Sequence, residues 1–294
     1  MSMRVTEQSM SARVRTGLQN NQGRLEKLRE QMASGKQVAK PSDSPTGAAH
    51  ALRLRGDIGA KERYVRSATD GAARLSTAEG ALGSASTLLN RARDLVLQGM
   101  SSPAVGDPAA REAIAGELDG LRDALLSVAN TTYLGRPVFG GTTSNEAAFD
   151  ASGAYTGDNG EVQRRIADNV QVRVDVSADA FGTGASQLFG VLDSIKANLR
   201  TNPSAVAADL DRLDLGIKSV NSELTAVGTR YSQLTAASDA AGAQSAQLSA
   251  DLSEIEDIDL MKAIIDLQGQ SVGYEAALGA TAKIVTPSLL DFLR

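Results

Sequence analysis

The fold is decided by residues 206–255, VAADLDRLDLGIKSVNSELTAVGTRYSQLTAASDAAGAQSAQLSADLSEI. Alternating steps of four and three residues along this stretch reach fifteen positions, of which only two serines are polar: Val206, Leu210, Leu213, Ile217, Val220, Leu224, Val227, Tyr231, Leu234, Ser238, Ala241, Ser245, Leu248, Leu252 and Ile255. Such a 3.5-residue repeat is typical of a long helix that buries one narrow stripe against other helices. At 1.5 Å per residue, this helix is about 75 Å long. We therefore expect a rod.

The composition of the 294-residue chain agrees with a helical rod and argues against several other classes of protein. Aromatic residues make up 3% and tryptophan is absent, which suits close packing of Ala- and Leu-rich helices. Cysteine is also absent, so disulfides and thiolate metal sites are excluded. The net charge of −5, without a basic stripe, argues against a nucleic-acid partner. We expect no secretory signal peptide and no membrane insertion, because no apolar run is long enough for either.

The two ends of the chain carry opposite charges. Residues 1–40 hold eight Lys and Arg against three Glu, a net charge of +5, and residues 251–294 hold eight acidic against three basic residues, a net charge of −5. Both ends also have helical patterns, so we expect them to lie side by side. Two independent solvated faces are the alternative interpretation.

The remaining helices are predicted from apolar spacing and from turn residues. Apolar residues at 14, 18, 25, 28 and 32, with Asn21 among them, predict a first helix that is marginal alone and folds against partners. After a break at residues 34–45, Ser44 and Pro45 open a second helix to about residue 101, and Asp107 and Pro108 open a third. The predicted divisions are 1–40, an N-terminal assembly helix; 45–135, the first half of the rod; 136–184, a β-rich insert; 185–255, the second half of the rod; and 256–294, a C-terminal assembly helix.

The insert at residues 136–184 is rich in glycine and lacks heptads. Val170, Val172, Val174 and Val176 alternate with polar residues, as in a half-buried strand, and residues 162–166 form a shorter run before a turn. We expect three to five strands here. The predicted fold class is thus mainly α, a long antiparallel coiled-coil or helical-bundle rod of paired N- and C-terminal helices with a small inserted β subdomain.

The long stripe changes register near residue 256. The next positions in its rhythm are charged, and a new stripe begins at Leu260. We expect a hinge where this slip faces the proline break, at Pro41, Pro45, Glu256, Asp257 and Asp259.

We find no catalytic, cofactor or metal constellation in the sequence. Residues 150–161 resemble a calcium loop only faintly, because the ligand spacing is wrong. The acidic residues at 254–259 have no nearby histidine, and a solvated acidic face is the preferred interpretation. His50, the single histidine, has no Ser or Cys partner. The sequence therefore predicts that the chain is not an enzyme and binds no cofactor or metal.

Several motifs resemble one family. They are SGK at 34–36, PSDSP at 41–45, NTTYLGRPVFGGT at 130–142, VGTR at 227–230, LSEIEDID at 252–259 and SLLDFL at 288–293. Together with paired end helices around a variable middle, they make the chain similar to the bacterial flagellin superfamily, and in particular to its hook-associated members. The β insert is the least diagnostic part.

The resemblance implies an extracellular location in the bacterial flagellum, reached by type III export without a cleaved signal. It implies a homo-oligomeric adaptor ring between the first hook-associated protein and flagellin, and an export chaperone on the C-terminal helix. The alternatives are a minor flagellin and, less favoured, an exposed adhesive or glycan-binding module. The expected assembly interface consists of Val14, Leu18, Asn21, Leu25, Leu28, Met32, Leu267, Tyr274, Leu278, Val285, Leu289 and Phe292.

Overall fold

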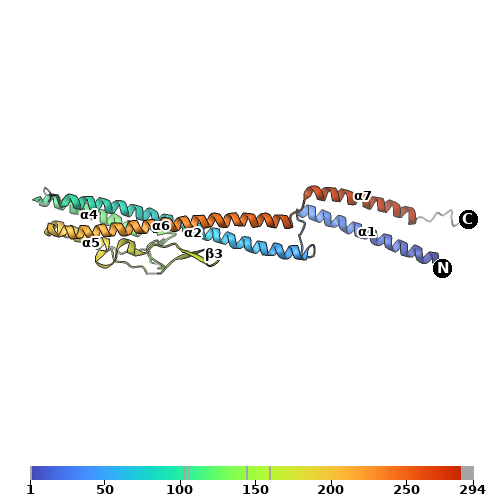
Figure 1. Cartoon of the computed structure of the whole chain (residues 1–294), viewed down its shortest axis with the longest axis horizontal. Helices are drawn as coiled ribbons and strands as arrows, with labels where there is room; N and C mark the ends of the chain where they lie inside the picture. Colours follow the sequence, from blue (N-terminus) through green and yellow to red (C-terminus); the bar gives the residue numbers. More distant parts are fainter. Residues whose placement is uncertain (1, 102–103, 105, 144, 159, 286–294) are drawn as a thin grey trace. The chain divides into compact units, whose positions relative to one another are not determined.

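The computed structural model describes residues 2–101, 104, 106–143, 145–158 and 160–285. The chain divides into two compact units, one within residues 1–59 and 245–294 and the other within residues 60–244. The predicted fold class is confirmed, since long helices dominate and the described strands form two small sheets (Figure 1). In the part of the chain that the structure describes, every helix is too short or too polar to cross a membrane.

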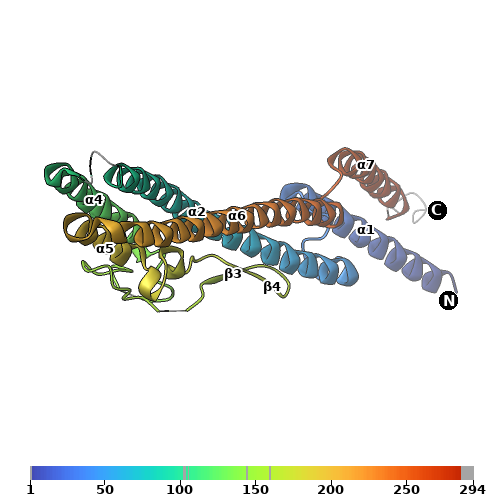
Figure 2. The same cartoon turned by 60° about the vertical axis from the view of Figure 1, so that its left-hand side comes forward.

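The unit within residues 60–244 contains α4 (Pro108–Ala129), α5 (Leu188–Thr201) and most of α2 (Pro45–Gly99) and α6 (Val206–Glu256). The predicted start of α4 is confirmed, because the Asp107 carboxylate accepts a hydrogen bond from the Ala109 amide at 2.9 Å and Pro108 follows the cap. Helices α4 and α5 pack against each other, as Figure 2 shows. Arg93 of α2 pairs with Asp214 of α6 at 2.7 Å.

The predicted stripe of α6 is the centre of this unit. Every seventh residue from its start, Val206, Leu213, Val220, Val227, Leu234 and Ala241, is at most 6% exposed. Helix α2 has the matching repeat, with Leu75, Leu82, Leu89 and Val96 at most 1% exposed. The intervening positions of α6 are less covered, and Tyr231 is 38% exposed. The seam therefore depends on one residue per heptad, and the alternate positions line its edges.

The β insert holds two antiparallel pairs, β1 (Thr132–Tyr133) with β2 (Arg136–Pro137) and β3 (Gln163–Ala167) with β4 (Val170–Arg173). The first pair begins at Thr132, before the predicted start of the insert at residue 136. Helix α4 ends at Ala129, so the chain is free to form a strand there. The predicted alternation in β4 is wrong in part. Val170 is 46% exposed, whereas Val174 and Val176 are buried beyond the end of the strand.

Aromatic residues are gathered under the insert. Phe139 and Phe149 lie 5.0 and 5.5 Å from Phe181 between ring centroids, at near-perpendicular angles, and Phe149 lies 5.3 Å from Phe189. These are four of the five phenylalanines in the chain. Edge-to-face packing of this kind adds to the energy of burial. The few aromatic residues thus cover the region where the chain leaves the heptad pattern.

The unit formed by the chain ends contains α1 (Ser2–Ser34), α7 (Leu260–Val285) and the adjoining turns of α2 and α6. Helix α6 ends at Glu256 and α7 begins at Leu260, so the predicted interruption of the stripe is confirmed. Ser44 and Pro45 open α2 as predicted, because Ser44 Oγ accepts a hydrogen bond from the Gly47 amide at 3.1 Å.

Alanine substitutions at two glycines of the insert distinguish the cost of a steric clash from the cost of a left-handed backbone angle. Gly141 (φ +69°) and Gly135 (φ +76°) are both left-handed, but only a Cβ at Gly141 would meet the Asp158 backbone oxygen, at 2.3 Å. We expect Gly141→Ala to lower the free energy of unfolding by about 1–3 kcal/mol more than Gly135→Ala. Urea denaturation followed by circular dichroism measures both. Equal losses would mean that the insert relaxes around the added methyl group.

Candidate functional site: the terminal helix pair and its joint

Helices α1 and α7 pack against each other, which confirms that the two ends of the chain lie side by side (Figure 1). On α1, Leu25 is 6% exposed, and the flanking positions of the predicted stripe are half-buried: Val14, Leu18, Asn21, Leu28 and Met32. On α7, Ala263 is 4% exposed, while Leu267 and Tyr274 are half-buried and Leu278 is exposed. Val285 lies in the last turn of α7, where only the backbone is described, and Leu289 and Phe292 lie outside the described residues.

A polar contact between described side chains crosses the α1–α7 pair. Asn21, the polar position in the predicted stripe of α1, accepts a hydrogen bond from Gln270 Nε2 at 3.1 Å. Both side chains are half-buried. A partly buried amide pair disfavours sliding of one helix along the other, because a shift of a few residues would leave both amides without a partner. This contact fixes the register of the pair.

Within the described residues, the opposite net charges of the two chain ends do not form direct contacts between these helices. Among the side chains that the structure describes, no ion pair joins α1 to α7. The ion pairs near α1 link it to the following loop, as between Lys27 and Asp43 at 3.1 Å and between Glu30 and Lys40 at 2.5 Å. The helix pair is therefore held by its apolar stripe and by the amide contact.

The joint of this unit is formed by two segments that connect helices. Lys36 and Asp257 form an antiparallel bridge. The Ile258 amide donates to the Gly35 carbonyl at 3.0 Å, and the Gln37 amide donates to the Glu256 carbonyl at 2.6 Å. Gly35 has a φ of +69°, a conformation that ends α1 and turns the chain into the bridge. The end of α1 and the end of α6 are thus fixed together by backbone hydrogen bonds.

Glu256 is the buried charge at this joint. It is 5% exposed, and its Oε2 lies 2.8 Å from Lys36 Nζ and 2.7 Å from Arg55 Nη2. Lys36 belongs to the connection after α1, and Arg55 belongs to α2, about three turns from its start. One carboxylate therefore ties three segments of the chain.

The interpretation of the acidic stretch as a solvated face is wrong for Glu256, although it holds for Glu254, Asp257 and Asp259, which are exposed. The cause is tertiary, because both cations lie about two hundred residues away in the sequence. Burial raises the pKa of Glu256, but hydrogen bonds and charges from Lys36 and Arg55 outweigh this effect, and the pKa lies below its ordinary value of 4.5.

The predicted hinge residues meet at this joint only in part. Glu256, Asp257 and Asp259 belong to it, and Pro45 is the first residue of α2. Pro41 lies in a tight turn in which Asp43 Oδ2 accepts a hydrogen bond from the Lys40 amide at 3.0 Å. Lys36 and Arg55 are not predictable as site residues from the sequence, because nothing local to either one indicates a buried partner.

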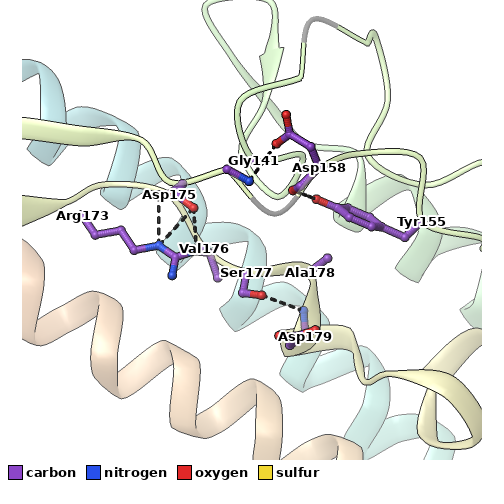
Figure 3. Close-up of a pocket in the computed structure, with 10 residues that line it drawn as sticks. Gly141, Tyr155, Asp158, Arg173, Asp175, Val176, Ser177, Ala178 and Asp179 are labelled. Atoms are coloured by element: carbon purple, nitrogen blue, oxygen red, sulfur yellow. Dashed lines mark hydrogen bonds and ion pairs between the residues drawn. The ribbon is translucent and has the colours of Figure 1, made fainter.

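A pocket of about 260 Å³ in the β insert is the alternative site (Figure 3). Its acidic side chains are largely used by the insert itself. Asp158 accepts hydrogen bonds from the Thr142 amide and hydroxyl at 2.6 and 2.7 Å, and these lower its pKa. Asp175 accepts from the Val162 amide at 2.8 Å and pairs with Arg173, also at 2.8 Å. Within the described residues, no group of His, Cys, Asp and Glu could hold a metal ion. The Asp158 and Asp175 side chains of this pocket thus hold the loops of the insert together.

Comparison with known proteins connects the helix pair to a family. The family model for the bacterial flagellin N-terminal helical region matches residues 5–144, and that for the C-terminal helical region matches residues 210–293. The chain belongs to the flagellin superfamily. The first match contains nearly all of α1 and the second contains α7, and the unmatched residues between them include most of the insert.

Individual relatives include both hook-associated proteins and flagellins. Flagellar hook-associated protein 3 of Salmonella typhimurium is 28% identical, over 97% of this chain and 96% of its own length. Flagellin of Bacillus subtilis is 25% identical, over 99% of this chain and 100% of its own. Flagellar hook-associated protein-3 of Legionella pneumophila has a similar solved structure, with a TM-score of 0.60 at 15% identity, over 69% of this chain and 98% of that one. As a flagellin-superfamily member, the chain is a structural component of the bacterial flagellum.

We predict that Glu256→Gln loosens the joint. A glutamine keeps the shape but removes the charge that holds Lys36 and Arg55. Both cations are partly exposed, so the expected loss of local stability is about 1–2 kcal/mol. Hydrogen–deuterium exchange of the Gln37 and Ile258 amides should become roughly tenfold faster. Glu254→Gln, an exposed change in the same turn region, is the matched control.

The same carboxylate sets a pH dependence. Because the pKa of Glu256 is lower in the folded chain, its stabilisation is complete above about pH 4.5 and is lost as the pH falls through the folded pKa. Once exchange is corrected for the intrinsic pH dependence of amide exchange, protection at the joint should therefore fall in acid in the wild type and not fall further in the Glu256→Gln variant. An unchanged exchange rate in that variant at neutral pH would contradict the role of the ion pairs.

Proposed function

We propose that this chain is the adaptor that joins the hook of the bacterial flagellum to its flagellin filament. The observation that carries the proposal is the α1–α7 pair, in which α1 belongs to the N-terminal family match and α7 to the C-terminal one. Similarity to hook-associated protein 3 over nearly the whole length of both chains supports the adaptor over a filament subunit.

In this proposal several copies form a ring outside the cell. The ring contacts the first hook-associated protein on one side and flagellin on the other. The chain reaches this place by type III export without a cleaved signal, and a cytoplasmic chaperone holds its C-terminal helix before export. The role is mechanical, so no enzymatic step and no cofactor is involved.

Assembly is proposed to complete the folding of the terminal helices. Among the side chains described in α1 and α7, only Leu25 and Ala263 are fully buried. Ordering each residue of a helix costs about 1–2 kcal/mol of conformational entropy, which so little burial does not offset. Contacts with neighbouring subunits would provide the missing burial. The hinge at residues 41–45 and 256–259 would let the pair adjust as it does so.

Limited digestion with trypsin tests this coupling. We expect early cleavage after exposed basic residues of α1, such as Arg13, Arg24 and Arg29, and within the C-terminal helix, leaving a resistant core of about residues 45–255. The seam of α2 and α6, whose heptad positions are buried, protects that core. Mass spectrometry identifies the fragments. If both ends of the soluble monomer resisted digestion as long as the core does, folding on assembly would be rejected.

Deleting the gene in the bacterium that encodes it tests the adaptor role itself. Electron microscopy should show hooks without filaments, and immunoblots should find flagellin in the medium. Restoring the gene on a plasmid should restore filaments. The full-length similarity to Bacillus subtilis flagellin favours a second candidate, a minor flagellin. Filaments that persist in the deletion strain would support that candidate and reject the adaptor.

A further inference from the structure

Helix α7 carries two apolar faces, and α1 covers one of them. The covered face contains Ala263, Leu267 and Tyr274, which are buried or half-buried. Met261, Ile265 and Val272 are 72%, 66% and 65% exposed. At about 100° per residue, these three lie within roughly 40° of one another and on the opposite side from Ala263. We refer to Met261, Ile265 and Val272 as the outer ridge.

A groove runs along the flank of the helix pair. It has a volume of about 340 Å³ and is lined from α1 by Arg24, Lys27, Leu28 and Gln31 and from α7 by Asp266 and Gln270. The groove and the outer ridge are different surfaces, since Asp266 and Gln270 lie roughly 100° or more around α7 from Ile265. Leu28 gives the groove an apolar wall, and Arg24 and Lys27 give it a basic rim.

Several charged side chains of the helix pair have no ion-pair partner among the described residues. Among the side chains that the structure describes, no ion pair involves Arg13, Arg15, Arg24 or Arg29 of α1. The same holds for Asp266 and Glu275 of α7. Glu275 is exposed and lies beside the outer ridge, three residues after Val272 and about 60° from it around the helix. An acidic flank beside the ridge is complementary to the basic rim of the groove.

We propose that the outer ridge of one copy packs into the groove of the next copy, with Ile265 beside Arg24 and Glu275 facing Arg13, which lies within about 20° of Arg24 around α1. This inference rests on the proposed function, because it identifies the surface through which the adaptor copies meet. The ridge would bury its three apolar side chains against Leu28 and the aliphatic parts of the groove residues. The occupant is a second copy of this chain, because one helix pair carries both the exposed apolar ridge and the groove, with charges of opposite sign beside them.

The contact is heterologous, and this determines the kind of assembly. Each copy offers one ridge and one groove, so a bound pair still has a free ridge at one end and a free groove at the other. Such contacts continue from copy to copy and form a ring if the rotation closes. A ridge packed against the same ridge of a second copy would instead be isologous and would stop at a dimer.

Absence of cysteine from the chain allows a clean cross-linking test. Ile265→Cys labels the ridge and Arg24→Cys labels the groove. Each variant, and the double variant, is expressed in the deletion strain, and isolated flagella are treated with a short bismaleimide. We expect the double variant to give a ladder of oligomers. Each single variant should stay monomeric, and co-expression of the two single variants should give dimers, which excludes cross-linking within one copy.

The matched control moves the label on α1. Arg29 lies about 140° around the helix from Arg24 and away from the groove. Ile265→Cys with Arg29→Cys should therefore give no ladder. Met261→Cys with Lys27→Cys is a second ridge–groove pair, used if the first double variant does not restore filaments. The wild-type gene must restore filaments before any variant is judged, and its failure would reject the proposed function and this inference together.

Three outcomes in flagella with restored filaments would overturn the inference and leave the adaptor role standing. One is the absence of oligomers in both ridge–groove pairs. The second is cross-linking of Ile265→Cys to itself, which would mean an isologous contact. The third is cross-linking of Ile265→Cys to a different flagellar protein, which would mean that the ridge faces another partner.

Discussion

The structure depends on the burial of one residue per heptad along α6. A single helix has no means of covering its own apolar stripe, so α6 needs a partner along its length. The positions of α6 that must be covered are Val206, Leu213, Val220, Val227, Leu234 and Ala241. The matching repeat in α2 provides the second half of the seam. Since the alternate positions are less buried, the seam is narrow, and the aromatic cluster adds a broader core only where the insert covers it.

The unit at the chain ends is stabilised differently. Its described helices bury few side chains, and its order depends on specific polar contacts, the Asn21–Gln270 amide pair and the Glu256 carboxylate with its two cations. Apolar stripes allow several registers, whereas hydrogen-bonded groups lose energy when they slide apart. This arrangement suits a subunit that must join neighbours. The polar contacts specify how α1 pairs with α7, while apolar surface on α7 stays available for contacts with other subunits.

The candidate site was predictable in part from the sequence. The half-buried stripe of α1 follows the predicted positions, and Asn21 has a polar partner on the opposite helix. Leu278 is exposed, and the ridge of Met261, Ile265 and Val272 was not foreseen, because in the sequence α7 has apolar residues nearly all round. Periodicity identifies residues that share a face, but it does not say which of two apolar faces is covered within the subunit.

The sequence by itself determined the helices, their caps and the place where the long stripe breaks. These features depend on local spacing and on backbone preferences of Pro, Gly and Ser, which act within a few residues. Only the tertiary structure decided that Glu256 is buried, that Lys36 and Arg55 neutralise it and that one face of α7 is free. Those features arise from residues brought together across some two hundred positions, where no local pattern records the partner.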